Sequence, residues 1–452
     1  MELSGGEVAA KRAKLTSDDL ADGGEDRLSA LPDDVLVLIL LRLSTPAAAR
    51  TSVLSRRWRR VWALLPELFF SFAPEPGGFR DALDAREAPL RSLFVDAEDA
   101  DPESLAVWLP AAALRVSGDL VLFNSTPGRD AEDGDDEEAA ERGVLELPCF
   151  EKAATVALYL GFLIGLAVPP AGVFSRLTCL SLSRMRFHGP CELGEAVSSA
   201  RCPCLKKLAV CRTRGLDNLT IHSESLLQLQ LQQLRGLRQL TIVVPELKEL
   251  SVIYCFGYDS SQPVANISAP RLLLLKWIDL YDQSSVQFGK MAQLQSLGDL
   301  LCFVYGHEDH WACNRAYLSL LQHFEVLEML TIMLTYLPEI DDYHNFEAPA
   351  ACSSVCICDQ QPNWKSEELL LNHLQEIEIQ ELSGSEHEVA FVERLFSWAT
   401  VLKQMTVTFC DPIAESKAKE LYQMFQSFSR PGICMKFYIC QNYIRKVYAP
   451  ED

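Results

Sequence analysis

One short pattern recurs along most of this chain and restricts its fold: two apolar residues three apart, followed by a third apolar residue two positions later. The last two positions alternate as in a β-strand, so they point into a core while the residues between them face the other way. The pattern therefore predicts a series of short strands. It occurs at Leu177-Leu180-Leu182, Leu205-Leu208-Val210, Leu226-Leu229-Leu231, Leu237-Leu240-Ile242, Leu247-Leu250-Val252, Leu272-Leu275-Trp277, Leu327-Leu330-Ile332, Leu374-Ile377-Ile379 and Leu402-Met405-Val407.

The spacing of the pattern fits a leucine-rich repeat, as in the steps from 205 to 226, 247 to 272 and 272 to 294. Stacked repeats of this kind place parallel strands in one sheet along a curved inner face. The shorter steps between 226, 237 and 247 predict hairpin-like or abbreviated repeats. Strands scattered in a non-repeat α/β domain are the alternative, which so many matches to one template disfavour. We expect an irregular α/β solenoid over residues 71–365.

The charge balance disfavours two classes of partner. The chain has 452 residues and a net charge of −21, with 62 Asp and Glu against 41 Lys and Arg. Binding to nucleic acid or to an anionic membrane depends on neutralising phosphates with basic side chains. We therefore expect no nucleic acid and no membrane among the partners. The acidic segment 129–142 is expected to be a solvated loop inserted between repeats.

Cysteine usage and the N-terminal residues bear on the compartment. The 15 cysteines are an odd number, and the N-terminal residues lack the apolar core of a signal peptide. Reduced thiols in the cytoplasm and/or nucleus are therefore expected. The apolar segment Val156–Val168 is closed by Pro169 and Pro170 and is too short for a membrane-spanning helix. We interpret it as a buried strand and turn.

Residues 1–26 are polar and are expected to be disordered, whereas residues 27–70 show helical periodicity. Pro32 suits a first helical position, Thr45 is a candidate N-cap before Pro46, and Ser55 can cap a further helix that contains Trp58. Such a short unit rarely stabilises itself. Its apolar stripe indicates either a partner surface or packing on the rest of the chain, and periodicity alone leaves both open.

The same residues resemble a known family. Leu31-Pro32-Asp33-Asp34-Val35-Leu36, Ile39-Leu40, Leu43 and Val53-Leu54-Ser55-Arg56-Arg57-Trp58-Arg59 are similar, in order, to the F-box. The resemblance implies docking on the Skp adaptor of a cullin-RING (SCF) ubiquitin ligase, and through that adaptor on the cullin. The adaptor contacts that it implies are Leu31, Pro32, Val35, Leu36, Ile39, Leu43, Val53, Leu54 and Trp58.

The C-terminal region, residues 366–452, contains the segment HLQEIEIQELSGSEHEVAFVERLFSWATVLKQMTV, which predicts strand, turn, helix, strand. Glu386 and Glu388 lie near the start of the expected helix. The segment resembles the FBD module that follows leucine-rich repeats in many plant F-box proteins. The resemblance implies a terminal cap on the last open edge of the repeats. The matching residues are His373-Leu374, Ile377-Glu378-Ile379, Gly384, His387-Glu388, Phe391-Val392, Leu402 and Met405-Thr406-Val407.

We find no set of residues in the sequence that is typical of an enzyme active site. A phosphate-binding loop, a G-x-S-x-G elbow and a dinucleotide fingerprint are all missing. The groups richest in potential metal ligands lack zinc spacing, so we expect no metal and no cofactor. The arginines at 56–60 are interpreted as a solvated helix face. The groups without zinc spacing are His307 with His310, Cys202 with Cys204, and Cys352 with Cys356 and Cys358.

The residues between the leucines are expected to form the exposed inner face of the repeats, where a target protein binds. They are mostly uncharged polar groups suited to hydrogen bonding. With the resemblance, this face implies a non-catalytic substrate-recognition subunit of an SCF E3 ubiquitin ligase. The alternative is a leucine-rich-repeat interaction scaffold not coupled to a ligase. The candidate target-binding residues are Lys207, Gln228, Gln230, Gln239, Thr241, Glu249, Ser251, Lys276 and Thr331.

Overall fold

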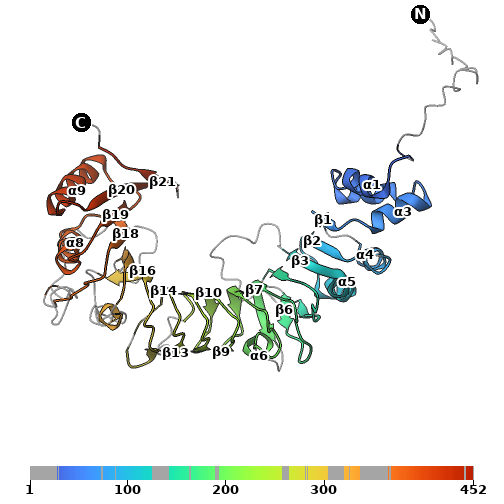
Figure 1. Ribbon diagram of the computed structural model, residues 1–452, viewed down its shortest axis with the longest axis horizontal. Coiled ribbons are helices and arrows are strands. Elements are labelled where there is room, and N and C mark those ends of the chain that lie inside the picture. The colour runs from blue at the N-terminus through green and yellow to red at the C-terminus, as the bar shows by residue number, and fades with distance from the viewer. Residues whose placement is uncertain are drawn as a thin grey trace, which may run out of the picture. The chain divides into compact units, whose positions relative to one another are not determined.

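The computed structural model describes residues 28, 30–72, 75–86, 88–124, 142–161, 164–188, 193–256, 264–279, 281, 283–303, 320–324, 326–335, 365, 368–441 and 444–450 (Figure 1). The expected disordered tail 1–26 lies outside them, as does the acidic segment 129–142 except for Arg142. By its internal contacts the chain divides into two compact units, Met1–Leu65 and Pro66–Asp452. Each unit is described by itself.

The first unit consists of three short helices, α1 (Asp33–Leu40), α2 (Thr45–Thr51) and α3 (Arg56–Ala63), and both α1 and α2 contact α3. Its buried apolar residues are Leu36, Leu40, Ala48, Val61 and Leu65. Leu36 and Leu40 are four residues apart and therefore lie on the same face of α1. The three predicted helices are thus confirmed.

Two of the predicted helix starts differ by one residue. Pro32 is the N-cap of α1, and Ser44 is the N-cap of α2, so that Thr45 is already helical. Neither cap residue makes a side-chain hydrogen bond. Ser55 caps α3 as predicted, because its Oγ accepts a hydrogen bond from the backbone N–H of Trp58 at 3.3 Å.

The second unit is built on one 17-stranded sheet. Its pairs are parallel throughout, except that β20 and β21 are antiparallel. β4 (Gly143–Glu146) and β6 (Ile164–Ala167) join it through β7. The other strands follow in chain order: β1 (Glu67–Phe70), β2 (Leu90–Asp96), β3 (Val116–Phe123), β5 (Thr155–Tyr159), β7 (Cys179–His188), β8 (Lys207–Arg214), β10 (Gln228–Arg235), β12 (Glu249–Ile253), β14 (Leu274–Ile278), β16 (Ser296–Phe303), β17 (Met329–Thr335), β18 (Glu376–Leu382), β19 (Gln404–Phe409), β20 (Cys434–Gln441) and β21 (Ile444–Val447).

Every predicted repeat pattern forms a strand, and its leucines enter the core. On β10, Leu229 and Leu231 are 2% and 0% exposed, while Gln230 between them faces outward and is half-buried. Leu229 is in register with Leu208 on one side and Leu250 on the other. Each fully buried leucine contributes roughly 1.5–3 kcal/mol through removal of apolar surface from water.

A second sheet corrects the prediction of hairpin-like or abbreviated repeats. The pattern at Leu237 to Ile242 forms β11 (Gln239–Val243), which pairs in parallel with two strands of a separate four-stranded sheet. Each central turn of the chain therefore supplies one strand to each sheet. A hairpin would require antiparallel neighbours, and β11 has only parallel ones. The other strands of this sheet are β9 (Asn218–His222), β13 (Val264–Ser268) and β15 (Val286–Phe288).

Strands β7, β8, β10 and β12 share a backbone feature near their ends. One residue per strand, which lies within β7, β8 and β10 and directly after β12, has a positive φ of 50–52°. On β7, β8 and β10 this residue separates two register-paired stretches, as Arg212 does between Cys211 and Thr213. The left-handed conformation is uncommon for residues other than glycine. It interrupts the strand alternation, because Cys211 and Arg212 are both half-buried before Thr213 turns inward. The four residues are Arg184, Arg212, Gln233 and Tyr254.

The helices of the second unit lie on the same side of the chain's turns as β9 and β13, and most of them lie towards its two ends (Figure 1). α4 (Pro76–Asp84) and α5 (Pro102–Arg115) contact each other beside the first strands, and α6 (Leu193–Ala196) contacts β9. The apolar segment Val156–Val168 forms the buried strands β5 and β6, as predicted. Within the described ranges, no helix is both long and apolar enough to cross a membrane.

The C-terminal segment has the predicted order of strand, helix, strand, with α8 (Glu386–Trp398) between β18 and β19. A further helix, α9 (Glu415–Phe428), leads to β20. The strands β18, β19 and β20 continue the parallel register of the preceding repeats. Only β21 departs from it, because it turns back antiparallel to β20.

Candidate functional site

The helical unit leaves large apolar side chains on its surface. Val53 is 80% exposed, Leu54 67%, Leu38 63%, Leu43 45% and Ile39 37%. Val53 and Leu54 follow the end of α2, directly before the cap of α3, so the chain presents them between two helices. Large exposed apolar side chains on so small a helical unit are candidates for an interaction surface. We call the residues Leu38, Ile39, Leu43, Val53 and Leu54 the apolar patch.

The adaptor contacts implied by the resemblance are distributed unevenly over the surface. Ile39, Leu43, Val53 and Leu54 belong to the apolar patch, and Pro32 is also exposed. The residues that are half-buried are Leu31, Val35 and Trp58. Leu36 requires a correction, because it is 1% exposed and lies on the inner face of α1 with Leu40. It supports the helix and presents no surface to a partner.

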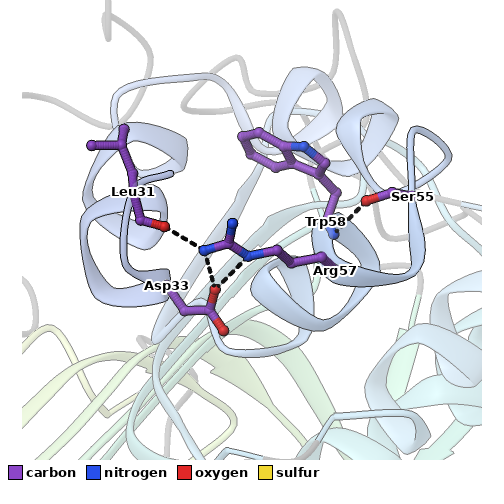
Figure 2. Close-up of polar contacts among 5 residues, drawn as sticks. All are labelled: Leu31, Asp33, Ser55, Arg57 and Trp58. Atoms are coloured by element: carbon purple, nitrogen blue, oxygen red, sulfur yellow. Dashed lines mark hydrogen bonds and ion pairs between the residues drawn. The ribbon is translucent and has the colours of Figure 1, made fainter. Parts of the chain in front are cut away.

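Arg57 connects the start of the helical unit to α3 (Figure 2). Its Nε donates a hydrogen bond to Asp33 Oδ1 at 2.9 Å, its Nη2 lies 2.8 Å from the same oxygen, and Nη2 also donates to the backbone oxygen of Leu31. The two charged side chains are 37% and 38% exposed. The prediction of a solvated arginine face fits Arg56, Arg59 and Arg60, which are exposed, but not Arg57.

The expected target-binding residues fall on two different sheets. Lys207, Gln228 and Glu249 are register neighbours on β8, β10 and β12, and Gln228 Nε2 donates to Glu249 Oε2 at 2.9 Å. Gln230, Ser251 and Lys276 form the next row of the same face. Thr331 lies on β17 of this sheet but is only 9% exposed.

Gln239 and Thr241 require a second correction, because they lie on β11 of the four-stranded sheet. Each turn of the chain in this region contains two strands with similar alternation, and only the register shows to which sheet a strand belongs. These two residues therefore do not belong to the candidate target-binding face of the 17-stranded sheet.

Outward-facing aromatic residues on the first strands were missed in the sequence. The ring centroids of Phe69 and Phe94 are 4.3 Å apart, those of Phe94 and Phe123 5.7 Å, and those of Phe123 and Tyr159 5.6 Å. The guanidinium of Arg184 lies 5.3 Å from the centre of the Tyr159 ring. We call Phe69, Phe94, Phe123 and Tyr159 the aromatic row. The sequence feature that could have predicted it is an aromatic residue at the outward position of several successive strands.

The candidate metal ligands divide between described and undescribed residues. Among the residues that the structure describes, no group of three or more His, Cys, Asp or Glu side chains is arranged to hold a metal ion. Cys202 is buried, its Sγ donates to the carbonyl of Ala196 at 3.3 Å, and burial raises the pKa of its thiol to about 12. Cys204 is exposed. Outside the described residues lie His307, His310, Cys352, Cys356 and Cys358.

Two family models match the chain. The model of the F-box domain matches residues 28–70, and the model of the LRR repeats of an FBD-associated F-box protein matches residues 105–296. The first match covers all three helices and extends into β1. The second covers the chain from α5 to the start of β16.

Similar proteins come from Arabidopsis thaliana. A putative F-box/FBD/LRR-repeat protein is 25% identical over 417 residues, which cover 89% of this chain and 78% of that protein. An F-box/FBD/LRR-repeat protein is 32% identical over 255 residues, which cover 50% of this chain and 53% of that protein. A putative F-box protein is 59% identical over 51 residues, 11% of each chain. The chain therefore carries an F-box domain followed by FBD-associated leucine-rich repeats, and its relatives are plant F-box/FBD/LRR-repeat proteins.

Proposed function

We propose that this protein is the substrate-recognition subunit of an SCF E3 ubiquitin ligase. The F-box helices dock on a Skp-type adaptor, and through it on a cullin, while the outward face of the 17-stranded sheet holds a target protein. Other subunits carry out ubiquitin transfer, so this chain contributes position and no catalytic side chain. Holding two partners together converts a rare encounter into a local one. The complex acts in the cytoplasm and/or nucleus.

The apolar patch is the observation that carries this proposal. F-box domains generally bind Skp1-type adaptors, and the patch lies within the residues that the F-box model matches. Val53 and Leu54 are the most exposed of its side chains. Covering a leucine or valine fully contributes roughly 1.5–3 kcal/mol, so a partner that buries several of these side chains gains a substantial part of its binding free energy.

Arg57 holds together two segments that carry expected adaptor contacts. Its bonds to Asp33 and to the backbone oxygen of Leu31 hold the segment before α1 against α3. α3 also carries Trp58, another implied adaptor contact. The ion pair thereby sets the distance between the two parts of the surface, and we propose it as a positioning contact for adaptor binding.

We further propose that the repeats form one continuous solenoid and that residues 366–452 serve as its FBD-like cap. Support comes from the continuous parallel pairing of β17, β18, β19 and β20. The short antiparallel β21 then pairs with the last four residues of β20. β21 carries Arg445 and Lys446, and charged residues on a short edge strand disfavour pairing with a further strand.

Matched surface substitutions test the proposal. Leu54→Asp changes a residue of the apolar patch that is 67% exposed, and Leu114→Asp changes a leucine of α5 that is 66% exposed. The full chain of each variant is co-expressed with a Skp-type adaptor and purified by a tag on this chain. We expect the adaptor to co-purify with wild type and with Leu114→Asp, but not with Leu54→Asp.

Equal adaptor recovery with Leu54→Asp and wild type would refute docking through the apolar patch. If the adaptor co-purifies with none of the three chains, the protein is an interaction scaffold that is not coupled to a ligase. Thermal unfolding of both variants accompanies the experiment, because substitution of an exposed residue should leave the melting temperature close to that of wild type.

A further inference from the structure

The aromatic row lies on the outward face of the sheet at its N-terminal end. On β2, Leu93 and Val95 are fully buried, and Phe94 between them points to the other side. On β3, Leu122 is buried while Phe123 at the strand end is 39% exposed. Phe69 on β1 is in register with Phe94 and is 55% exposed. The rings therefore form part of the surface across β1, β2, β3 and β5.

Core packing does not explain these rings, because the row stops at β7. Tyr159 is in register with Ser183, and Ser183 with Cys211 and Gln232. The same outward position is thus aromatic on β3 and β5 and carries a smaller or polar side chain on the next three strands. Exposed aromatic side chains gathered on one part of a surface are typical of the centres of protein interfaces.

A pair of arginines lies where the aromatic row ends. Arg184 places its guanidinium over the Tyr159 ring, and Arg212 on the neighbouring strand donates from Nε to Gln233 Oε1 at 2.9 Å. Both residues have the same left-handed backbone conformation, with φ of 51° and 52°. In a chain with a net charge of −21, this local positive charge favours an acidic group at that end of the row.

We propose that the aromatic row, together with Arg184 and Arg212, is a docking subsite for a target segment in which an aromatic or large aliphatic residue is followed by acidic residues. The apolar side chain stacks on the rings of Phe94, Phe123 and Tyr159, and the acidic side chains lie over the arginines. This subsite rests on the proposed function, since it names the chemistry of the target that the sheet would hold.

The first test selects peptides on the intact protein. The full chain is immobilised and a random peptide library is displayed against wild type, Phe123→Ser, Arg184→Glu and Val243→Ser. Val243 is 37% exposed on β11 of the other sheet and serves as the matched control. We expect wild type and Val243→Ser to enrich peptides with an aromatic or aliphatic residue next to Asp or Glu. Arg184→Glu should enrich peptides with Lys or Arg in place of the acids.

The second test measures affinity. A labelled synthetic peptide with the enriched sequence, and a copy with its acids changed to lysine, are titrated with each chain and followed by fluorescence anisotropy. Phe123→Ser should weaken the acidic peptide about tenfold or more, as truncation of a central aromatic contact does at interfaces. Phe123→Tyr keeps a ring and should stay within about threefold of wild type on the same scale.

Several outcomes would overturn the inference. They are enrichment of peptides without the apolar–acidic pattern, equal binding by Phe123→Ser and wild type, or an unchanged charge preference in Arg184→Glu. Concentration-dependent dimerisation of wild type that Phe123→Ser abolishes would assign the row to a second copy of the chain instead. Adaptor co-purification is measured on the same variants. If the adaptor does not co-purify with the wild-type chain, the ligase proposal is refuted but the docking subsite is not, because peptide selection does not involve the adaptor.

Discussion

Leucine and valine side chains differ in exposure between the helical unit and the repeat sheet. On β10, Leu231 is 0% exposed, and the same holds for Leu250 and Leu275 on strands further along the sheet. In the helical unit, Leu54 and Val53 remain 67% and 80% exposed. A strand in the sheet has a neighbour on each side that completes its core. Three short helices cannot enclose all of their own apolar residues, so several of these remain at the surface.

The largest expected effect comes from removing a buried leucine. Leu231→Ala should lower the free energy of unfolding by roughly 2–5 kcal/mol, because it removes apolar contacts and leaves a cavity in the sheet core. The same change at Leu54 should alter it by no more than about 0.5 kcal/mol, because that side chain is already 67% exposed in the folded chain. Urea unfolding followed by far-UV circular dichroism measures both. A cost above about 1 kcal/mol at Leu54 would mean that the two regions do not differ in this way.

A buried carboxylate gives the repeat region a pH dependence. Asp279 is 8% exposed and accepts hydrogen bonds from the backbone N–H groups of Cys255 and Phe256. Burial raises its pKa to about 7 from an ordinary value of 3.8. The folded chain therefore retains this proton to a higher pH than the unfolded chain does. This contribution to stability is complete below about pH 4 and is lost as the pH rises towards 7.

Replacing Asp279 by Asn tests that contribution. The free energy of unfolding of wild type should fall by about 1.4 kcal/mol for each pKa unit of the shift as the pH is raised across this window. Asp279→Asn should lack that part of the decline, although it also weakens one backbone hydrogen bond. Parallel pH profiles for the two chains would show that Asp279 ionises normally in the folded state.

Removing the side-chain cap at the start of α8 should have an intermediate effect on stability. Ser385 Oγ accepts from the N–H of Glu388, while Glu388 Oε2 accepts from Ser383 Oγ, Gly384 N and Ser385 N at 2.6–2.9 Å. Ser385→Ala should cost about 1 kcal/mol, because one N–H at the helix start loses its acceptor. Hydrogen exchange of the first turn of α8 measures this locally, and Ser397→Ala near the end of the helix is the control. Unchanged protection in Ser385→Ala would assign no stabilising role to the cap.

Replacing Arg57 should have a small effect on stability. Its pair with Asp33 is more than a third exposed, so Arg57→Gln should lower the free energy of unfolding by no more than about 1 kcal/mol. Adaptor affinity should nevertheless fall, because the segment at Leu31 is no longer held against α3. Arg56→Gln, on an exposed neighbour, is the matched control, and surface plasmon resonance with a Skp-type adaptor measures both. Identical affinities would leave Arg57 with no positioning role.

Strand and helix identities were predictable because they depend on short-range periodicity. Leu229 and Leu231 share one face of β10 whatever lies beside that strand, and Ser55 can cap α3 because the N–H of Trp58 is three residues away. Where several local solutions exist, prediction was less accurate. Pro32 and Thr45 are each displaced by one residue from their expected positions at helix starts, because both sites lack a side-chain cap that would define the boundary.

The candidate surfaces were predictable only in part. Val53 and Leu54 were expected contacts, and the structure leaves both exposed. Leu36 was also expected, but helical spacing alone did not separate the inner face of α1 from the outer one. The polar residues Gln239 and Thr241 were assigned to the wrong sheet, because their strand has the same alternation as the strands of the 17-stranded sheet.

The sequence by itself determined the repeating strands, the three N-terminal helices and the apolar residues that those helices carry, since each depends on residues only a few positions apart. The tertiary structure decided which strands share a sheet, that Arg57 reaches Asp33, and that Phe94, Phe123 and Tyr159 form one row beside Arg184. The side-chain contacts named here join residues at least 24 positions apart in the chain, as Arg57 and Asp33 are, and only the parallel register or helix packing brings them together.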